Sequence, residues 1–90
     1  MRCIEVHGII RKDTPLRYRN DFKGSAVFEY PPALGKKNAE KPIEFSVERS
    51  ALGNVAVSVR LLEDIDYPVL PVIKSLKEHI FDLDKKGLLP

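Results

Sequence analysis

The sequence predicts an α+β domain in which a two-layer arrangement is built from four antiparallel strands and one C-terminal helix, in the order β-β-β-β-α. Two observations lead to this prediction. Apolar and polar residues alternate through most of the first 62 positions, which is the period of half-buried strands. From Val69 onward, apolar residues recur at steps of three and four, which is the period of an amphipathic helix. A sheet with one apolar face needs a cover, so we expect the helix to pack on it within a single domain of residues 1–90.

The first predicted strand spans residues 3–12. Its two faces are expected to carry Ile4, Val6, Gly8 and Ile10 on one side and Cys3, Glu5, His7, Ile9 and Arg11 on the other. Residues 12–15 favour a turn, because Asp13 can bond to its own backbone and Pro15 fixes φ. We therefore expect the chain to reverse direction here.

The segment 16–24 is open to two interpretations. Its first half alternates apolar residues with arginines, which suits a short extra strand, but its asparagine, aspartate and glycine favour a loop. We interpret it as a basic loop with local strand character. The second strand is then expected at residues 25–30, and Pro31-Pro32 ends it because proline donates no hydrogen bond to a sheet.

The clearest strands are the third and fourth, at residues 42–50 and 54–62, which follow an exposed loop at 33–41. A three-residue hairpin loop needs a left-handed residue at its last position, and Gly53 supplies it. This turn places Val47 by Val57, Phe45 by Val59 and Glu44 opposite Arg60. All the apolar side chains of the hairpin then lie on one face.

The predicted helix carries a single apolar stripe of Val69, Val72, Ile73, Leu76, Ile80 and Leu83. Asp66 is a suitable N-cap and Pro68 suits the first turn. Two lysines at 85–86 favour the negative end of the helix, and Gly87 is a natural residue to follow it.

Length and composition limit the class of protein. A chain of 90 residues with 43% hydrophobic and 31% charged residues is a folded domain rather than a disordered tail or a membrane protein. The N-terminus lacks the apolar core of a secretory signal, and the lone Cys3 excludes a disulfide within the chain. Both features favour a cytoplasmic protein. A core this small gains from dimerisation, which makes a homodimer an expectation.

No arrangement of residues predicts an enzyme. The polar face of the sheet is expected to display Glu5, His7, Glu29, Glu44, Glu48, Ser58 and Arg60, with Cys3 at one end. Cys3, Glu5 and His7 cannot all reach one metal ion, and the chain has no metal-ligand spacing, nucleophile motif or phosphate-binding glycine loop. We predict no catalytic residue, no metal site and no cofactor, with a small nuclease built on His7 and the basic segment as an alternative.

The residues that favour a nucleic-acid partner lie in the basic segment 11–23, where basic residues interleave with aromatic ones. That is the chemistry of phosphate contact combined with base stacking. The candidate contact residues are Arg11, Lys12, Arg17, Tyr18, Arg19 and Lys23. The net charge of only +2 and the glutamates of the polar face argue against such a partner.

The leading hypothesis is therefore a non-catalytic binding module that contacts an unknown protein partner or associates with itself. Its sheet has two edge strands, which natural proteins must block or pair. Ile9 and Leu62 on the polar face, and Leu88-Leu89 after the helix, are expected to join an interface. The alternative is a small nucleic-acid-binding domain that uses the basic loop 11–23. No membrane partner is expected.

Overall fold

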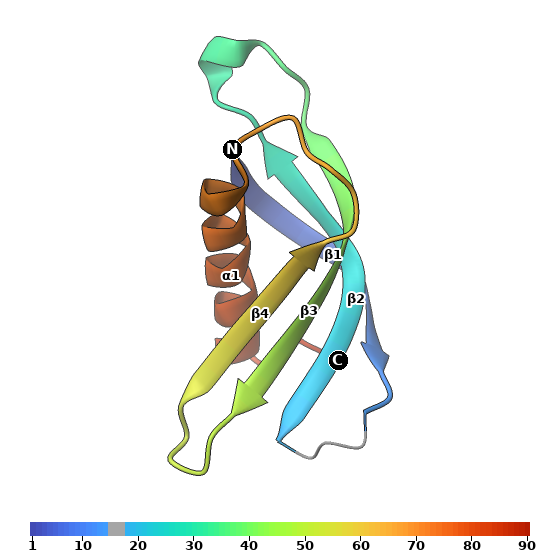
Figure 1. The fold of residues 1–90 in the computed structure, drawn as a ribbon, viewed down its shortest axis with the longest axis vertical. Coiled ribbons are helices and arrows are strands. Elements are labelled where there is room, and N and C mark those ends of the chain that lie inside the picture. Colours follow the sequence, from blue (N-terminus) through green and yellow to red (C-terminus); the bar gives the residue numbers. More distant parts are fainter. Residues whose placement is uncertain (15–17) are drawn as a thin grey trace.

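The computed structural model, which describes residues 1–14 and 18–90, contains one four-stranded antiparallel sheet with a helix packed on it (Figure 1). The elements in chain order are β1 (Arg2–Lys12), β2 (Arg19–Glu29), the 3-10 turn η1 (Pro32–Leu34), β3 (Ala39–Arg49), β4 (Val55–Leu61) and α1 (Val69–Lys85). The strands neighbour one another in the order β1-β2-β3-β4, which makes the sheet a simple meander. The predicted α+β fold class is confirmed.

Helix α1 packs against the two outer strands, β1 and β4, while the central strands bend behind it (Figure 1). One face of the sheet is thus covered by α1, and we call the other face the open face. The connection from β1 to β2 and the β3–β4 turn lie at one end of the sheet, and η1 lies at the opposite end.

The core lies between the covered face of the sheet and α1. Its buried apolar residues are Cys3, Val6, Phe22, Ala26, Phe28, Ile43, Phe45, Val47, Val72, Leu76 and Ile80. Phe22 of β2 and Phe45 of β3 are stacked, with ring centroids 5.0 Å apart. Burial of a large apolar side chain stabilises the fold by roughly 1.5–3 kcal/mol, so this cluster is the main source of stability.

The β3–β4 hairpin forms as predicted. The register pairs Val47 with Val57 and Glu44 with Arg60, whose side chains form an ion pair at 2.8 Å. Gly53 adopts the left-handed φ of 85° that the turn requires, and the Ser50 N–H donates to the Asn54 carbonyl oxygen at 2.9 Å.

The helix follows the predicted stripe, with Val72, Leu76 and Ile80 fully buried. The expectation that Asp66 caps it is wrong: the N-cap is Pro68, which forms no side-chain cap, and Asp66 lies 2.5 Å from Lys36 instead. The expected role of Gly87 is confirmed. It has a left-handed φ of 70° directly after the C-cap.

Strand β2 is longer than predicted, because it begins at Arg19 and includes most of the segment that we interpreted as a loop. Phe22 anchors this half of the strand in the core. Gly24 is not a loop residue, since a Cβ atom there would lie 3.0 Å from the His7 carbonyl oxygen of β1. The glycine therefore marks a close approach of two strands. Strand β3 also starts earlier than predicted, at Ala39, where it pairs with Phe28.

The predicted alternation of β1 is wrong in its detail. Its pairing with β2 slips between Cys3 and Glu5 and again between His7 and Ile10, which are two bulges or irregularities. Each slip changes the face toward which the following side chains point. Cys3 and Val6 are therefore both buried, Ile9 is half-buried against the core, and Ile4 and Ile10 are exposed.

Candidate interaction surface

The basic segment does not form one surface. Arg11 lies opposite Phe22 on the covered side and donates to Asn20 Oδ1, whereas the neighbouring Lys12 points to the open face. The register places Arg19 and Lys23 on the open face as well, and Tyr18 is 54% exposed. Arg17 lies outside the described residues. The structure thus brings Lys12, Arg19 and Lys23 to one face and leaves Arg11 on the other.

Two of these three bases are already engaged by carboxylates of the same sheet. Lys12 Nζ lies 3.4 Å from Glu44 and Arg19 Nε lies 2.7 Å from Asp21. The bond to Asp21 raises the pKa of the Arg19 guanidinium above its usual value. Lys23 forms no ion pair with a described residue. A phosphate would therefore have to displace an existing partner at Lys12 and Arg19.

The same residues surround a shallow hollow of about 290 Å³ on the open face. Ser46, which is 7% exposed, and Ser58 contribute hydroxyl groups to it. Its charged lining residues are Lys12, Arg19, Asp21, Glu44 and Arg60. The mixture of signs leaves no strong local field for an anion or a cation.

The expected polar face is confirmed for its glutamates, His7, Ser58 and Arg60, which the register places on the open face. Cys3 is the exception, because it is only 5% exposed in the core. Burial raises the pKa of its thiol to about 11. His7 pairs with Glu40 at the surface. Among residues 1–14 and 18–90, no three His, Cys, Asp or Glu side chains are placed to hold a metal ion.

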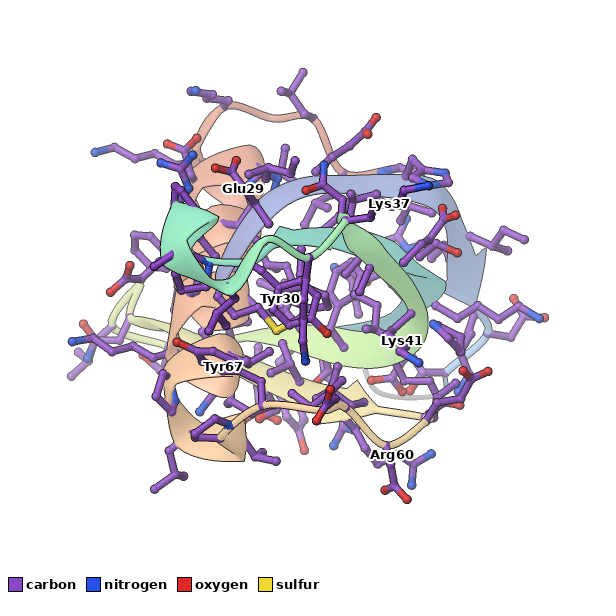
Figure 2. The ribbon with its side chains drawn as sticks, turned by 90° about the horizontal axis from the view of Figure 1, so that it is seen from above. Glu29, Tyr30, Lys37, Lys41, Arg60 and Tyr67 are labelled. Carbon is purple, nitrogen blue, oxygen red and sulfur yellow. The ribbon has the colours of Figure 1, made fainter. Side chains whose placement is uncertain are left out.

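At the η1 end, two tyrosines pack together. The rings of Tyr30 and Tyr67 meet edge to face at 6.2 Å, and the Lys36 ammonium lies 5.1 Å from the centre of the Tyr30 ring. Figure 2 looks down on this end and shows Tyr67 beside the helix, with Lys37, Lys41 and Arg60 farther from it. Lys36 and Asp66 form an ion pair that joins the β2–β3 and β4–α1 connections. This cluster fastens two loops together.

The outer edge of β1 is poorly suited to pairing with another strand. Its two register slips break the regular spacing of backbone groups, and Gly8 between them has a left-handed φ of 62°. The Cys3 N–H donates to Ser75 Oγ of α1 at 2.9 Å, so the helix occupies one donor of this strand. Bulges and covering elements are devices that keep an edge strand from pairing.

The outer edge of β4 has none of these features. Its pairing with β3 runs without a slip from Val55 to Leu61. The Leu62 N–H bonds to the Pro42 carbonyl oxygen and the Ser50 N–H bonds to the Asn54 carbonyl oxygen, which shows that the even-numbered residues of β4 bond to β3. Bonded and non-bonded pairs alternate in an antiparallel ladder. The backbone groups of Val55, Val57, Val59 and Leu61 therefore point away from β3.

A groove of about 460 Å³ runs beside this edge, between β4 and α1. Val57 and Phe81 supply its apolar wall, and Phe81 is 47% exposed. The charged lining residues are Lys77, Glu78, Asp82 and Lys85, two of each sign. The β4 edge and this groove together form what we call the β4 surface: an unpaired row of backbone donors and acceptors with an apolar hollow next to it.

Sequence reasoning anticipated that two edge strands need protection but missed which edge is unprotected. The signal was present in Gly8, a glycine inside an otherwise regular strand pattern, which is typical of a bulge. Phe81 carries no such signal, because its exposure depends on how α1 rotates against the sheet.

The fold and this surface define a small two-layer α+β domain with an unpaired edge strand. The chain belongs to the BB-0187 family, whose model matches residues 1–85. No match was found among curated proteins or among solved structures. In the described part of the chain, no helix is long and apolar enough to cross a membrane.

Proposed function

We propose that this protein is a small non-catalytic interaction module that binds an extended protein strand at the β4 surface. The single observation that carries this proposal is the unbroken, unpaired edge of β4. Backbone hydrogen bonds to an added strand give affinity, and pockets beside the edge give specificity. The groove at Val57 and Phe81 is such a pocket.

The rest of the molecule supports a binding role for this edge. The hollow on the open face carries charges of both signs that are paired with one another, so it lacks the strained or unpaired groups typical of a catalytic site. We further propose that the protein acts in the cytoplasm, since a lone buried thiol suits a reducing compartment.

Site-specific photo-crosslinking tests the proposal. A photoreactive amino acid replaces Ala56, an exposed residue of β4, and in a matched variant it replaces Glu5, an exposed residue of β1. We expect illumination of cells that express each variant to give a protein adduct at position 56 and none at position 5. An adduct that forms equally at both positions, or at neither, would contradict the proposal.

Nucleic-acid binding is the second candidate. It is favoured by the exposed Tyr18 and by Lys23, which pairs with no carboxylate of the described residues. These residues would bind as a small contact near the β1–β2 end of the open face. Phosphate contacts make affinity fall steeply with salt. An amide NMR titration with a mixed single-stranded oligonucleotide at low salt tests this candidate. Shifts at Tyr18 and Lys23 that vanish in Lys23→Ala would support it, and the absence of shifts would exclude it.

A further inference from the structure

We infer that the strand bound at the β4 surface is β4 of a second copy of this chain, in an antiparallel pair centred on Ser58. The inference rests on the proposed function, because it names the occupant of the same edge. A two-fold axis through the Ser58 pair, perpendicular to the sheet, would join the two sheets into one. Both helices would then lie on the same side of the joined sheet.

The backbone geometry restricts the register. Only the outward-pointing residues Val55, Val57, Val59 and Leu61 can bond across the new interface, so odd-numbered residues must face odd-numbered ones. Symmetry about Ser58, the middle residue of β4, pairs Val57 with the partner's Val59 and Val55 with the partner's Leu61. This arrangement pairs every residue of the strand, and a shift in either direction leaves an end unpaired.

The side chains of the open face agree with this register. Arg60 is the only charged residue of β4, and it would lie opposite the partner's Ala56. A register centred on Arg60 would instead set two guanidinium groups against each other, which destabilises a strand pair. At the two-fold axis, Ser58 would meet the partner's Ser58, and both are small enough for the close approach of a non-hydrogen-bonded pair.

The groove agrees on the covered face. The partner's Val59, directly opposite Val57, would point to the side of the sheet on which α1 lies. It would enter the groove beside Phe81, whose ring is 47% exposed, and cover part of that ring. The two lysines and two carboxylates of the groove sum to no net charge. Two copies can therefore approach each other there without repulsion, which is the charge complementarity that an interface between identical surfaces needs.

A cysteine cross-link tests the register. In Ser58→Cys, the two new thiols would lie on Cα atoms about 4.5 Å apart, within the range that a disulfide spans. In the control Ala56→Cys, each thiol faces the partner's Arg60 and is more than about 10 Å from its own copy. Both positions are exposed, so neither variant disturbs the core. The native Cys3 does not compete, because it is buried.

We expect mild oxidation to convert most of Ser58→Cys, and little of Ala56→Cys, into a disulfide-linked dimer on a non-reducing gel. Equal cross-linking of the two variants, or none in Ser58→Cys, would overturn the inferred register.

Sedimentation equilibrium tests the association itself. At high micromolar concentration we expect the unmodified chain to sediment at twice its mass of 10.2 kDa. Val57→Pro removes an outward N–H that takes no part in the β3–β4 ladder, whereas Val57→Thr keeps that N–H and a similar shape. Because the hydrogen bond is lost twice in a symmetric pair, we expect Val57→Pro to weaken the dimer by about tenfold to a hundredfold. Val57→Thr should change it far less. Amide NMR spectra establish that both variants are folded.

The two proposals fail in different ways. A monomer at high micromolar concentration overturns the inference that β4 binds a second copy. If position 56 nevertheless cross-links to a different protein in cells, the proposed function stands with another occupant. If neither a dimer nor an adduct at position 56 forms, both proposals are overturned.

Discussion

The two outer strands of the sheet, β1 and β4, differ in how their free backbone groups are protected. Strand β1 has two register slips, a left-handed glycine at Gly8 and a donor occupied by Ser75 of the helix. Strand β4 pairs regularly over its whole length, and its outer edge borders an apolar groove. Exposed regular edges favour association, and proteins usually block them. A chain that blocks one edge and leaves the other regular has a single direction in which another strand can add.

The comparison also teaches how one helix serves both edges. Helix α1 packs against β1 and β4, but it bonds to the backbone of β1 through Ser75 and leaves space beside β4 at Phe81. The following predictions change the protected edge and its support, and each should leave the β4 edge able to pair unless the fold is lost.

The largest effect is expected from Phe22→Ala. Phe22 is 2% exposed, stacks on Phe45 and supports the half of the sheet to which the second part of β1 is paired. Removal of a buried phenylalanine side chain costs about 3–5 kcal/mol of unfolding free energy. Urea unfolding followed by circular dichroism measures it. Tyr18→Ala, at an exposed position, is the control and should cost far less. A loss below about 1 kcal/mol in Phe22→Ala would contradict the described core.

Ser75→Ala is expected to loosen the protected edge. The Ser75 hydroxyl accepts the hydrogen bond of the Cys3 N–H, which lies in a buried residue. A buried donor without a partner costs about 1–3 kcal/mol. Urea unfolding should show this loss, and amide hydrogen exchange at Cys3 should become faster. Ser58→Ala on the open face removes a hydroxyl of the same kind and should be nearly neutral. Unchanged exchange at Cys3 would show that the helix does not fasten β1.

Gly8→Ala tests the bulge of β1. The φ of 62° at Gly8 is unfavourable for a residue with a Cβ atom by about 1–2 kcal/mol, although open space surrounds the position. We expect that loss in urea unfolding. Gly8→Asn is the matched control, since asparagine tolerates this conformation better and should cost less. Equal losses in the two variants would mean that backbone conformation is not the cause.

The smallest effect is expected from pH, through Cys3. Burial raises the pKa of the folded thiol to about 11 from an ordinary value of 9.0. A raised pKa contributes stability that is complete below the unfolded value and is lost as pH rises through the folded one. Between pH 8 and 10 this loss should be about 1 kcal/mol. Cys3→Ala removes the titrating group, so its stability should fall less over the same pH range. Identical pH dependence in the two proteins would exclude a buried thiol.

The fold class and the β3–β4 hairpin were predictable because local rules agree there. The glycine at position 53 and the alternation around it require the same register. The start of β2 was not predictable in the same way, because Gly24 is a typical loop residue and only the nearby His7 carbonyl oxygen explains it. That contact joins two different strands, and no local pattern encodes it.

The candidate site was predictable only in kind. The small core and the two free edges indicate self-association from the sequence alone, and that remains a proposal. The choice between the edges depends on two bulges in β1 and on the orientation of Phe81. The basic segment failed as a single surface for a related reason. A strand replaces the expected loop, and strand geometry sends Arg11 and Lys12 to opposite faces.

Amide hydrogen exchange of Val57 and Val59, measured as a function of protein concentration, tests the difference between the two edges most directly. Their N–H groups point away from β3, so within one copy they have only solvent as a partner. We predict that both amides exchange about tenfold or more slowly at high micromolar than at low micromolar concentration, while the amides of β1 do not change. Rates at Val57 and Val59 that are independent of concentration, or a change confined to β1, would contradict the account.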